Sequence, residues 1–226
     1  EIAKATFQNG NTTELGLDKG IVLCTGNPDY IPGPNLECEL STLLNTPGHP
    51  LLTAVSNNDF TCDAAILEFD FIPETDTLKF YYVYGSDEYN NNFSFGNSDI
   101  FACLISGPDP DGGYYSNENI AIVPGSNDTP IQTETINNYQ APCGNPSSGP
   151  CINCEYFWDN NGGLHLEYDG FTTVLGGWLN VIPCEIYHVF IGIADFGPEG
   201  WGYFDSGVFI QQTDYQSPVM QITLSP

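Results

Sequence analysis

Hydrophobic and polar residues alternate with a period of two over much of the chain, and this pattern predicts β-strands rather than helices. In the segment 66–71, Leu67, Phe69 and Phe71 fall on one face, while Glu68 and Asp70 fall on the other. The segment 77–84 follows after a turn at 73–76, so we expect the two segments to form an antiparallel pair. Further strands are expected at residues 21–24, 100–105, 119–123, 164–168, 172–178, 186–195, 207–212 and 220–224.

The remaining pattern predicts a single all-β domain over residues 1–226. The segment 186–194 is apolar on both faces, which is typical of a central strand, and one or two helical turns are expected at 40–44 and 50–55. Gly, Pro, Asn and Asp clusters separate the strands at short intervals. We therefore predict a jelly-roll-like two-sheet β-sandwich with long disulfide-stapled loops. The two long polar loops are 106–117 and 139–163, and the second holds three cysteines.

The charge of the chain excludes several classes of partner. Asp and Glu number 29, Lys and Arg number 3, and the net charge is −26. Such a chain repels phosphate, so neither nucleic-acid binding nor insertion into anionic membranes is expected. With 41% hydrophobic residues the chain is not disordered, and its charge suits a surface bathed in salt or divalent cations. It begins at Glu1 without Met, which suggests processing or excision from a longer protein.

The cysteines favour an oxidising, extracellular compartment. Their even number predicts four disulfides and no free thiol, with Cys143 bonded to Cys151 or Cys154. Cys151 and Cys154 form a C-x-x-C motif, but zinc would need a second ligand pair and a redox role would need a βαβ unit. The eight positions predicted in disulfides are Cys24, Cys38, Cys62, Cys103, Cys143, Cys151, Cys154 and Cys184.

Several motifs in a fixed order carry a family resemblance. They include Tyr82-Val83-Tyr84-Gly85-Ser86-Asp87-Glu88-Tyr89, Asp99-Ile100-Phe101-Ala102, Tyr168-Asp169-Gly170-Phe171 and Asp205-Ser206-Gly207-Val208-Phe209. Over residues 5–212 the chain resembles the choice-of-anchor L family, domains of large secreted and surface proteins, chiefly of Bacteroidota. The resemblance implies a surface module but no activity. It also implies that an N-terminal edge strand is missing or supplied by a partner, and residues 213–226 are a candidate edge or donated strand.

Acidic residues at strand ends make calcium the sharpest chemical hypothesis. Strand ends distant in sequence can meet at one rim of a sandwich, and Ca²⁺ prefers carboxylate and carbonyl oxygens. The alternative is that each acid caps a turn or is solvated. The candidate ligands are Asp87, Glu88, Asp99, Asp195 and Asp205.

Enzymatic chemistry has little support in the sequence. The only histidines are His49, His165 and His188, and no nucleophile elbow accompanies them. With so many acids, some carboxylate pair always suits a glycosidase, so that signal is empty. Trp158 and Trp201 lie in polar loops and are the candidate rings for glycan binding, whereas strand aromatics such as Tyr82 and Trp178 are expected in the core or in cross-strand pairs.

These observations predict a non-enzymatic, extracellular structural or adhesion module of a bacterial surface protein or filament, stabilised by calcium. The alternative function is a carbohydrate-binding, lectin-like module. The expected partners are other copies or neighbouring domains of the same surface protein, contacted through residues before 20 or after 217, and glycans. The expected location is secreted or cell-surface.

Overall fold

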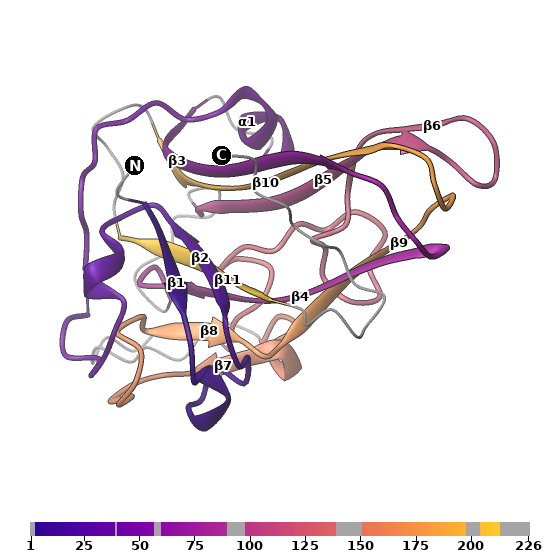
Figure 1. Cartoon of the computed structure of the whole chain (residues 1–226). Helices are drawn as coiled ribbons and strands as arrows, with labels where there is room; N and C mark the ends of the chain where they lie inside the picture. Colours follow the sequence, from indigo (N-terminus) through magenta and orange to yellow (C-terminus); the bar gives the residue numbers. More distant parts are fainter. Residues whose placement is uncertain are drawn as a thin grey trace.

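The computed structural model describes residues 3–38, 40–56, 60–89, 98–138, 151–197 and 204–212. Two antiparallel sheets face each other (Figure 1), which confirms the two-sheet sandwich. The larger sheet has the order β1 (Lys4–Phe7), β2 (Gly20–Cys24), β11 (Ser206–Gln211), β4 (Thr77–Ser86), β8 (Gly170–Thr172) and β7 (Phe157–Asp159), and β9 (Leu175–Asn180) also pairs with β4. The smaller sheet has the order β3 (Thr61–Phe71), β10 (Tyr187–Phe196), β5 (Ile100–Pro108) and β6 (Tyr114–Asn119).

The main core lies between the two sheets. Alternate residues of β4 point into it, and the rings of Tyr82 and Phe101 meet there with centroids 5.0 Å apart. Strand β10 lies between β3 and β5, and Val189, Ile191 and Ile193 are fully buried. The expectation of a central strand at 186–195 is therefore confirmed.

Helices are few and short in the described part of the chain. They are α1 (Pro50–Ser56) and the 3-10 turns η1 (Gly10–Thr12), η2 (Pro28–Tyr30) and η3 (Cys154–Tyr156). Helix α1 matches the turn expected at 50–55, and its Leu52 packs with Ile100, Ala102 and Phe190 in a small separate cluster. No helical turn forms at 40–44. None of the helices among the described residues has the length and apolar character to cross a membrane.

The expected pairing of 66–71 with 77–84 is wrong. Strand β3 pairs with β10 in the smaller sheet, whereas β4 pairs with β11, β8 and β9 in the larger one. The turn between β3 and β4 therefore connects the two sheets instead of closing a hairpin. Both strands are strongly apolar on one face, and placing them in opposite sheets lets both apolar faces enter the same core.

Other strand boundaries also differ from the expectation. Strand β6 begins within the predicted loop 106–117 and ends at residue 119, whereas residues 120–123 and 164–168 contribute only isolated bridges. The segment 172–178 is divided between β8 and β9. At the N-terminus, Lys4–Phe7 forms an edge strand within its own sheet. The segments 220–224 and 213–226 lie outside the described residues.

The prediction that every cysteine is in a disulfide is wrong. Cys151 and Cys154 bond to each other, so neither bonds to Cys143, which lies outside the described residues; Cys38 is also disulfide-bonded. The thiols are Cys24, Cys62, Cys103 and the exposed Cys184. Strand β10 separates Cys62 on β3 from Cys103 on β5, and two strand spacings alone amount to about 10 Å, whereas a disulfide requires Cα atoms within about 7 Å. In this interior they serve as small apolar side chains.

Candidate functional site

The five acids predicted as calcium ligands meet at one end of the sandwich. Asp87 and Glu88 follow β4, Asp99 precedes β5, Asp195 lies near the end of β10, and Asp205 precedes β11. Antiparallel pairing brings these ends together, since Ser86 is opposite Ser206 and Ile100 is opposite Ala194. All five acids are buried, with exposed fractions between 0% and 5%. The convergence expected from the sequence is therefore present.

The inner part of this cluster is formed by Glu88, Asp99 and Asp195. Glu88 Oε2 accepts hydrogen bonds from the backbone N–H of Asp99 and from Thr133 Oγ1, both at 3.1 Å. Asp99 Oδ1 accepts from the backbone N–H of Phe196 at 3.0 Å. The side chain of Asp195 lies beside that of Asp99, close enough for each to influence the pKa of the other. Asp99 Oδ2 and Asp195 Oδ1 are buried and have no hydrogen-bond partner.

Burial and mutual repulsion shift the pKa values of the cluster upward. Burial is the main cause in each case; it raises the pKa of Asp99 to about 7 and that of Asp205 to about 6. The pKa values of Glu88 and Asp195 lie well above the ordinary range through burial and then through the charge of Asp99. Burial, followed by Glu167 and Asp169, does the same to Asp87. The neighbouring charges that shift these groups are themselves acidic.

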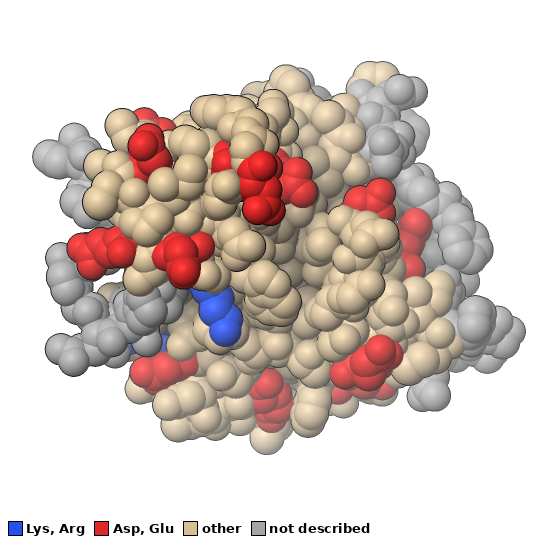
Figure 2. Space-filling view, turned by 90° about the vertical axis from the view of Figure 1, so that its right-hand side faces the viewer, with Lys and Arg blue, Asp and Glu red and all other residues tan. Residues whose placement is uncertain are grey.

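The surface carries a different distribution of charge. Figure 2 shows one face on which acidic side chains are scattered and basic ones occupy a small area. The whole chain has three basic residues, Lys4, Lys19 and Lys79. Scattered surface acids are solvated and screened, whereas acids at the buried end of the sandwich are not. The buried cluster is therefore the part of the molecule where negative charge is costly.

A segment whose described residues, 35–38 and 40–46, have no regular secondary structure passes along this end from the larger sheet to the smaller one (Figure 1), and we call it the strap. Its N–H groups bind a second set of acids that sequence reasoning missed as site residues, together with Asp205. The bonds run from Asn35 Nδ2 to Asp169 Oδ1 at 3.2 Å, Glu37 N to Glu167 Oε1 at 3.2 Å, Thr42 N to Asp205 Oδ1 at 2.7 Å, and Leu44 N and Thr46 N to the Asp63 carboxylate at 3.0 and 2.6 Å. The strap is thus attached to the sandwich through carboxylates.

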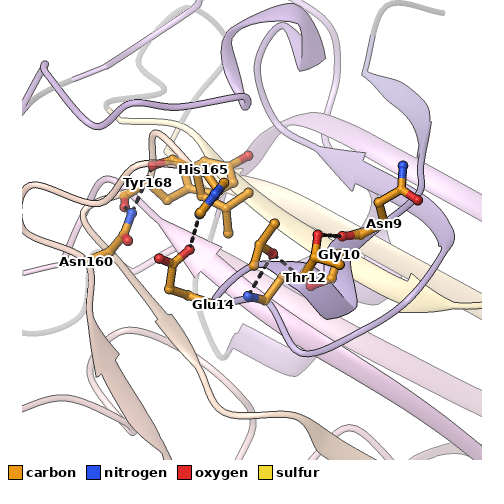
Figure 3. Close-up of polar contacts among 10 residues, drawn as sticks. Asn9, Gly10, Thr12, Glu14, Asn160, His165 and Tyr168 are labelled. Carbon is orange, nitrogen blue, oxygen red and sulfur yellow. Dashed lines mark hydrogen bonds and ion pairs between the residues drawn. The ribbon is translucent and has the colours of Figure 1, made fainter.

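Asn160 positions the segment that carries Glu167 and Asp169. It is buried, and its side-chain Nδ2 donates to the carbonyls of Leu166 at 2.9 Å and Tyr168 at 2.7 Å (Figure 3). Tyr168 then packs edge-on to Phe209, against the outer face of the larger sheet. An Asn in a polar, Gly-rich stretch is the signal that could have suggested such a turn-organising side chain.

The histidines occupy three separate places. His165 Nδ1 lies 2.7 Å from Glu14 Oε2 (Figure 3), His188 bonds Asp70 and Glu68, and His49 packs on the ring of Phe190 at 4.8 Å. Two of them therefore form exposed ion pairs with acids, and one stacks on an aromatic ring.

The tryptophans differ in how far they can act as ligand platforms. Trp158 is 48% exposed and stacks on Phe171 with centroids 6.4 Å apart, and Trp201 lies outside the described residues. Tyr82 is fully buried, as expected of a strand aromatic. Trp178 is 61% exposed and stands opposite Lys79 across β4 and β9, so it is outside the core.

The acids do not form a ready-made coordination shell. Within the described ranges, no group of three or more His, Cys, Asp or Glu side chains has an arrangement that could hold a metal ion as it stands. Ligation by these residues would need adjustment of their side chains or contributions from backbone carbonyls and water. The calcium assignment accordingly stays a prediction.

The fold and its buried acidic end define a disulfide-containing, antiparallel β-sandwich module. The model of the Choice-of-anchor L domain matches residues 2–216, and the chain belongs to this family. Membership implies an extracellular or surface protein. Neither the curated proteins nor the solved structures contain a match to the chain.

Proposed function

We propose that this chain is a non-enzymatic structural or adhesion module of a surface protein, and that calcium bound among its buried carboxylates stabilises it. The observation that carries the calcium proposal is the pair of buried oxygens, Asp99 Oδ2 and Asp195 Oδ1, without hydrogen-bond partners. A buried polar atom without a partner costs about 1–3 kcal/mol, and more when it is charged. A divalent cation bound to both oxygens would remove that cost, and it would also neutralise the repulsion between the two carboxylates.

Calcium suits this end of the sandwich better than a more demanding ion. It accepts about 6–8 oxygen ligands in flexible geometry, whereas zinc prefers nitrogen and sulfur in a tetrahedron. The neighbouring groups are carboxylates and hydroxyls, including Glu88, Thr25 and Ser206. Without a cation, protons must occupy part of the cluster, as the raised pKa values of Asp99 and Asp205 imply. Calcium would therefore bind in exchange for protons.

The structural and adhesive role rests on family membership and on the open edge of the larger sheet. Among the described residues, strand β1 pairs only with β2, so a strand from a neighbouring copy or domain could add to its other side. The charge of −26 would oppose such association at low ionic strength. Calcium and salt would each reduce that repulsion.

Thermal unfolding tests the calcium proposal. Protein unfolded in chelator and refolded without metal is compared in EGTA and in millimolar calcium, which also removes any kinetically trapped ion. A ligand at a hundredfold its dissociation constant adds about 2.7 kcal/mol, so we expect Tm to rise by several degrees. Asp195→Asn should lose most of the rise, and Asp128→Asn, an exposed acid, should keep it. Equal Tm values in EGTA and calcium would exclude the proposal.

A further inference from the structure

One stretch of the larger sheet leaves its outer face uncovered. Elsewhere on this face Val22, Val83 and Phe209 are buried, and Tyr168 packs on Phe209. Where β4 pairs with β9, the same face carries three cross-strand pairs and remains accessible. The pairs are Tyr81 with Gly176, Lys79 with Trp178, and Thr77 with Asn180; we call these six residues the aromatic strip.

The rings of the aromatic strip form one surface. A Cβ atom placed on Gly176 would lie 3.3 Å from Trp178 Cζ3 and 3.4 Å from Tyr81 Cε1, so both rings border this glycine. Lys79 Nζ lies 4.9 Å from the centroid of the Tyr81 ring. Trp178 is 61% exposed, and Thr77 and Asn180 are exposed beside it. A large indole is thus held open to solvent between a second ring and three hydrogen-bonding side chains.

We propose that the aromatic strip binds an uncharged oligosaccharide. A sugar ring presents a flat C–H face that stacks on an indole and hydroxyls that pair with an amide, a hydroxyl or an ammonium group. Thr77 and Tyr81 are four residues apart on one strand, so the strip is about 14 Å long, enough for a short chain of sugars rather than a single ring.

The charges on the molecule select the class of ligand. The strip itself contains no carboxylate, and the adjoining Asp76 accepts a hydrogen bond from Thr77 Oγ1. A polyanion approaching the strip meets a chain at −26, and so does a second copy of this chain. A neutral polyhydroxylated ligand meets no such repulsion. This site is separate from the calcium proposal and does not depend on it.

Native electrophoresis through gels containing laminarin, hydroxyethylcellulose or mannan tests the assignment, with alginate as the anionic comparison. We expect at least one neutral polysaccharide to retard the protein. Trp178→Ala should weaken that binding tenfold or more, and Trp178→Phe should retain part of it. Tyr114→Ala removes an exposed ring elsewhere and should leave binding unchanged, and Trp158→Ala tests the other candidate ring. The Tm of each variant confirms that it is folded.

Three results would overturn the assignment. The first is the absence of retardation by every neutral polysaccharide, or retardation by alginate alone. The second is binding that survives Trp178→Ala or is lost only in Trp158→Ala. The third is a dimer, seen by sedimentation, that Trp178→Ala dissociates, because the strip would then be covered by a second copy. If calcium does not stabilise the protein, these three results can still be interpreted, because the aromatic strip is separate from the calcium proposal.

Discussion

Asp63 and Asp195 lie side by side at one end of the smaller sheet, yet their surroundings differ completely. Both are 1% exposed, and Asp195 is paired with Cys62, the neighbour of Asp63. The Asp63 carboxylate accepts hydrogen bonds from Leu44 N, Thr46 N and Thr46 Oγ1. Asp195 instead faces Asp99 and leaves one oxygen without a partner. Burial of an acid therefore does not define its role; the donors around it do.

This contrast divides the acidic end into two functional parts. Asp63 in the smaller sheet, and Asp205 and Glu167 beside the larger one, hold the strap against the sandwich through its backbone N–H groups. Asp99 and Asp195 instead lie beside each other, and burial followed by the charge of Asp99 raises the pKa of Asp195. The first part contributes stability directly, and the second does so only when protons or a cation neutralise it.

Asp63→Asn should have the largest effect on stability. An amide keeps one acceptor oxygen but turns an NH₂ group toward a backbone N–H, so at least one hydrogen bond is replaced by two facing donors. Bonds to charged acceptors are worth about 1.5–3 kcal/mol each, and we expect a loss of about 3 kcal/mol. Urea unfolding measures it, and the loss should be equal in EGTA and calcium. A loss below about 1 kcal/mol would contradict the role of Asp63 in holding the strap.

The sequence could predict the inner part of the cluster but not the strap contacts. Asp87, Glu88 and Asp205 adjoin apolar strands, so their place at a strand end follows from the period-two pattern. Asp63 instead occupies an inward position early in β3. Its partners come from a segment with no periodicity, and the conformation of such a segment is set by tertiary contacts rather than local propensity.

Strand pairing is also set by tertiary contacts, and this explains the errors in the predicted pairing. The pattern located β4, β5, β10 and β11 because each has a continuous buried face. It could not assign β3 and β4 to opposite sheets, since a short turn permits either a hairpin or a crossing between sheets. The thiol positions depended on that assignment too, because distances between cysteines follow from strand order and not from sequence spacing.

The pH dependence of stability without metal should show which buried acids destabilise the fold when they ionise: Asp99 of the second part and Asp205 of the first. Asp99 has a folded pKa of about 7 and Asp205 of about 6, both raised above the ordinary value of 3.8. A raised acid contributes stability that is fully present below its unfolded pKa and is lost as pH rises through the folded pKa. In EGTA we expect the free energy of unfolding to fall by a few kcal/mol between pH 5 and pH 8.

Calcium and one substitution sharpen this test. A bound cation keeps the carboxylates ionised without repulsion, so the fall should be much smaller in millimolar calcium. Asp195→Asn removes the neighbour of Asp99 and should reduce the fall in EGTA, whereas Asp128→Asn should not. Urea titrations at each pH supply the free energies. A free energy of unfolding that does not change with pH in EGTA would mean that ionisation of the inner acids does not destabilise the folded protein.

The smallest effect should come from an exposed acid pair that is neutralised by a histidine. His188 lies 2.8 Å from Asp70 Oδ1 and 2.9 Å from Glu68 Oε1 on the outer face of β3 and β10, and these acids, Asp70 first, raise its pKa. The contribution of His188 to stability is therefore fully present below about pH 6.5, and it is lost as pH rises through the raised pKa of the folded protein. The imidazole is 41% exposed, so solvent screens the pair strongly.

His188→Gln should cost about 0.5 kcal/mol at pH 5.5 in low salt and nothing measurable at pH 9. This dependence has the same sign as that of the buried acids, so pH alone does not separate the two. Salt does, because at about 1 M the Debye length falls to about 3 Å and exposed pairs lose most of their energy. The His188 contribution should therefore vanish in 1 M NaCl, while the pH profile of the buried cluster in EGTA should persist. A cluster profile that collapses with salt as well would place those acids in contact with solvent, and the distinction between the two environments would fail.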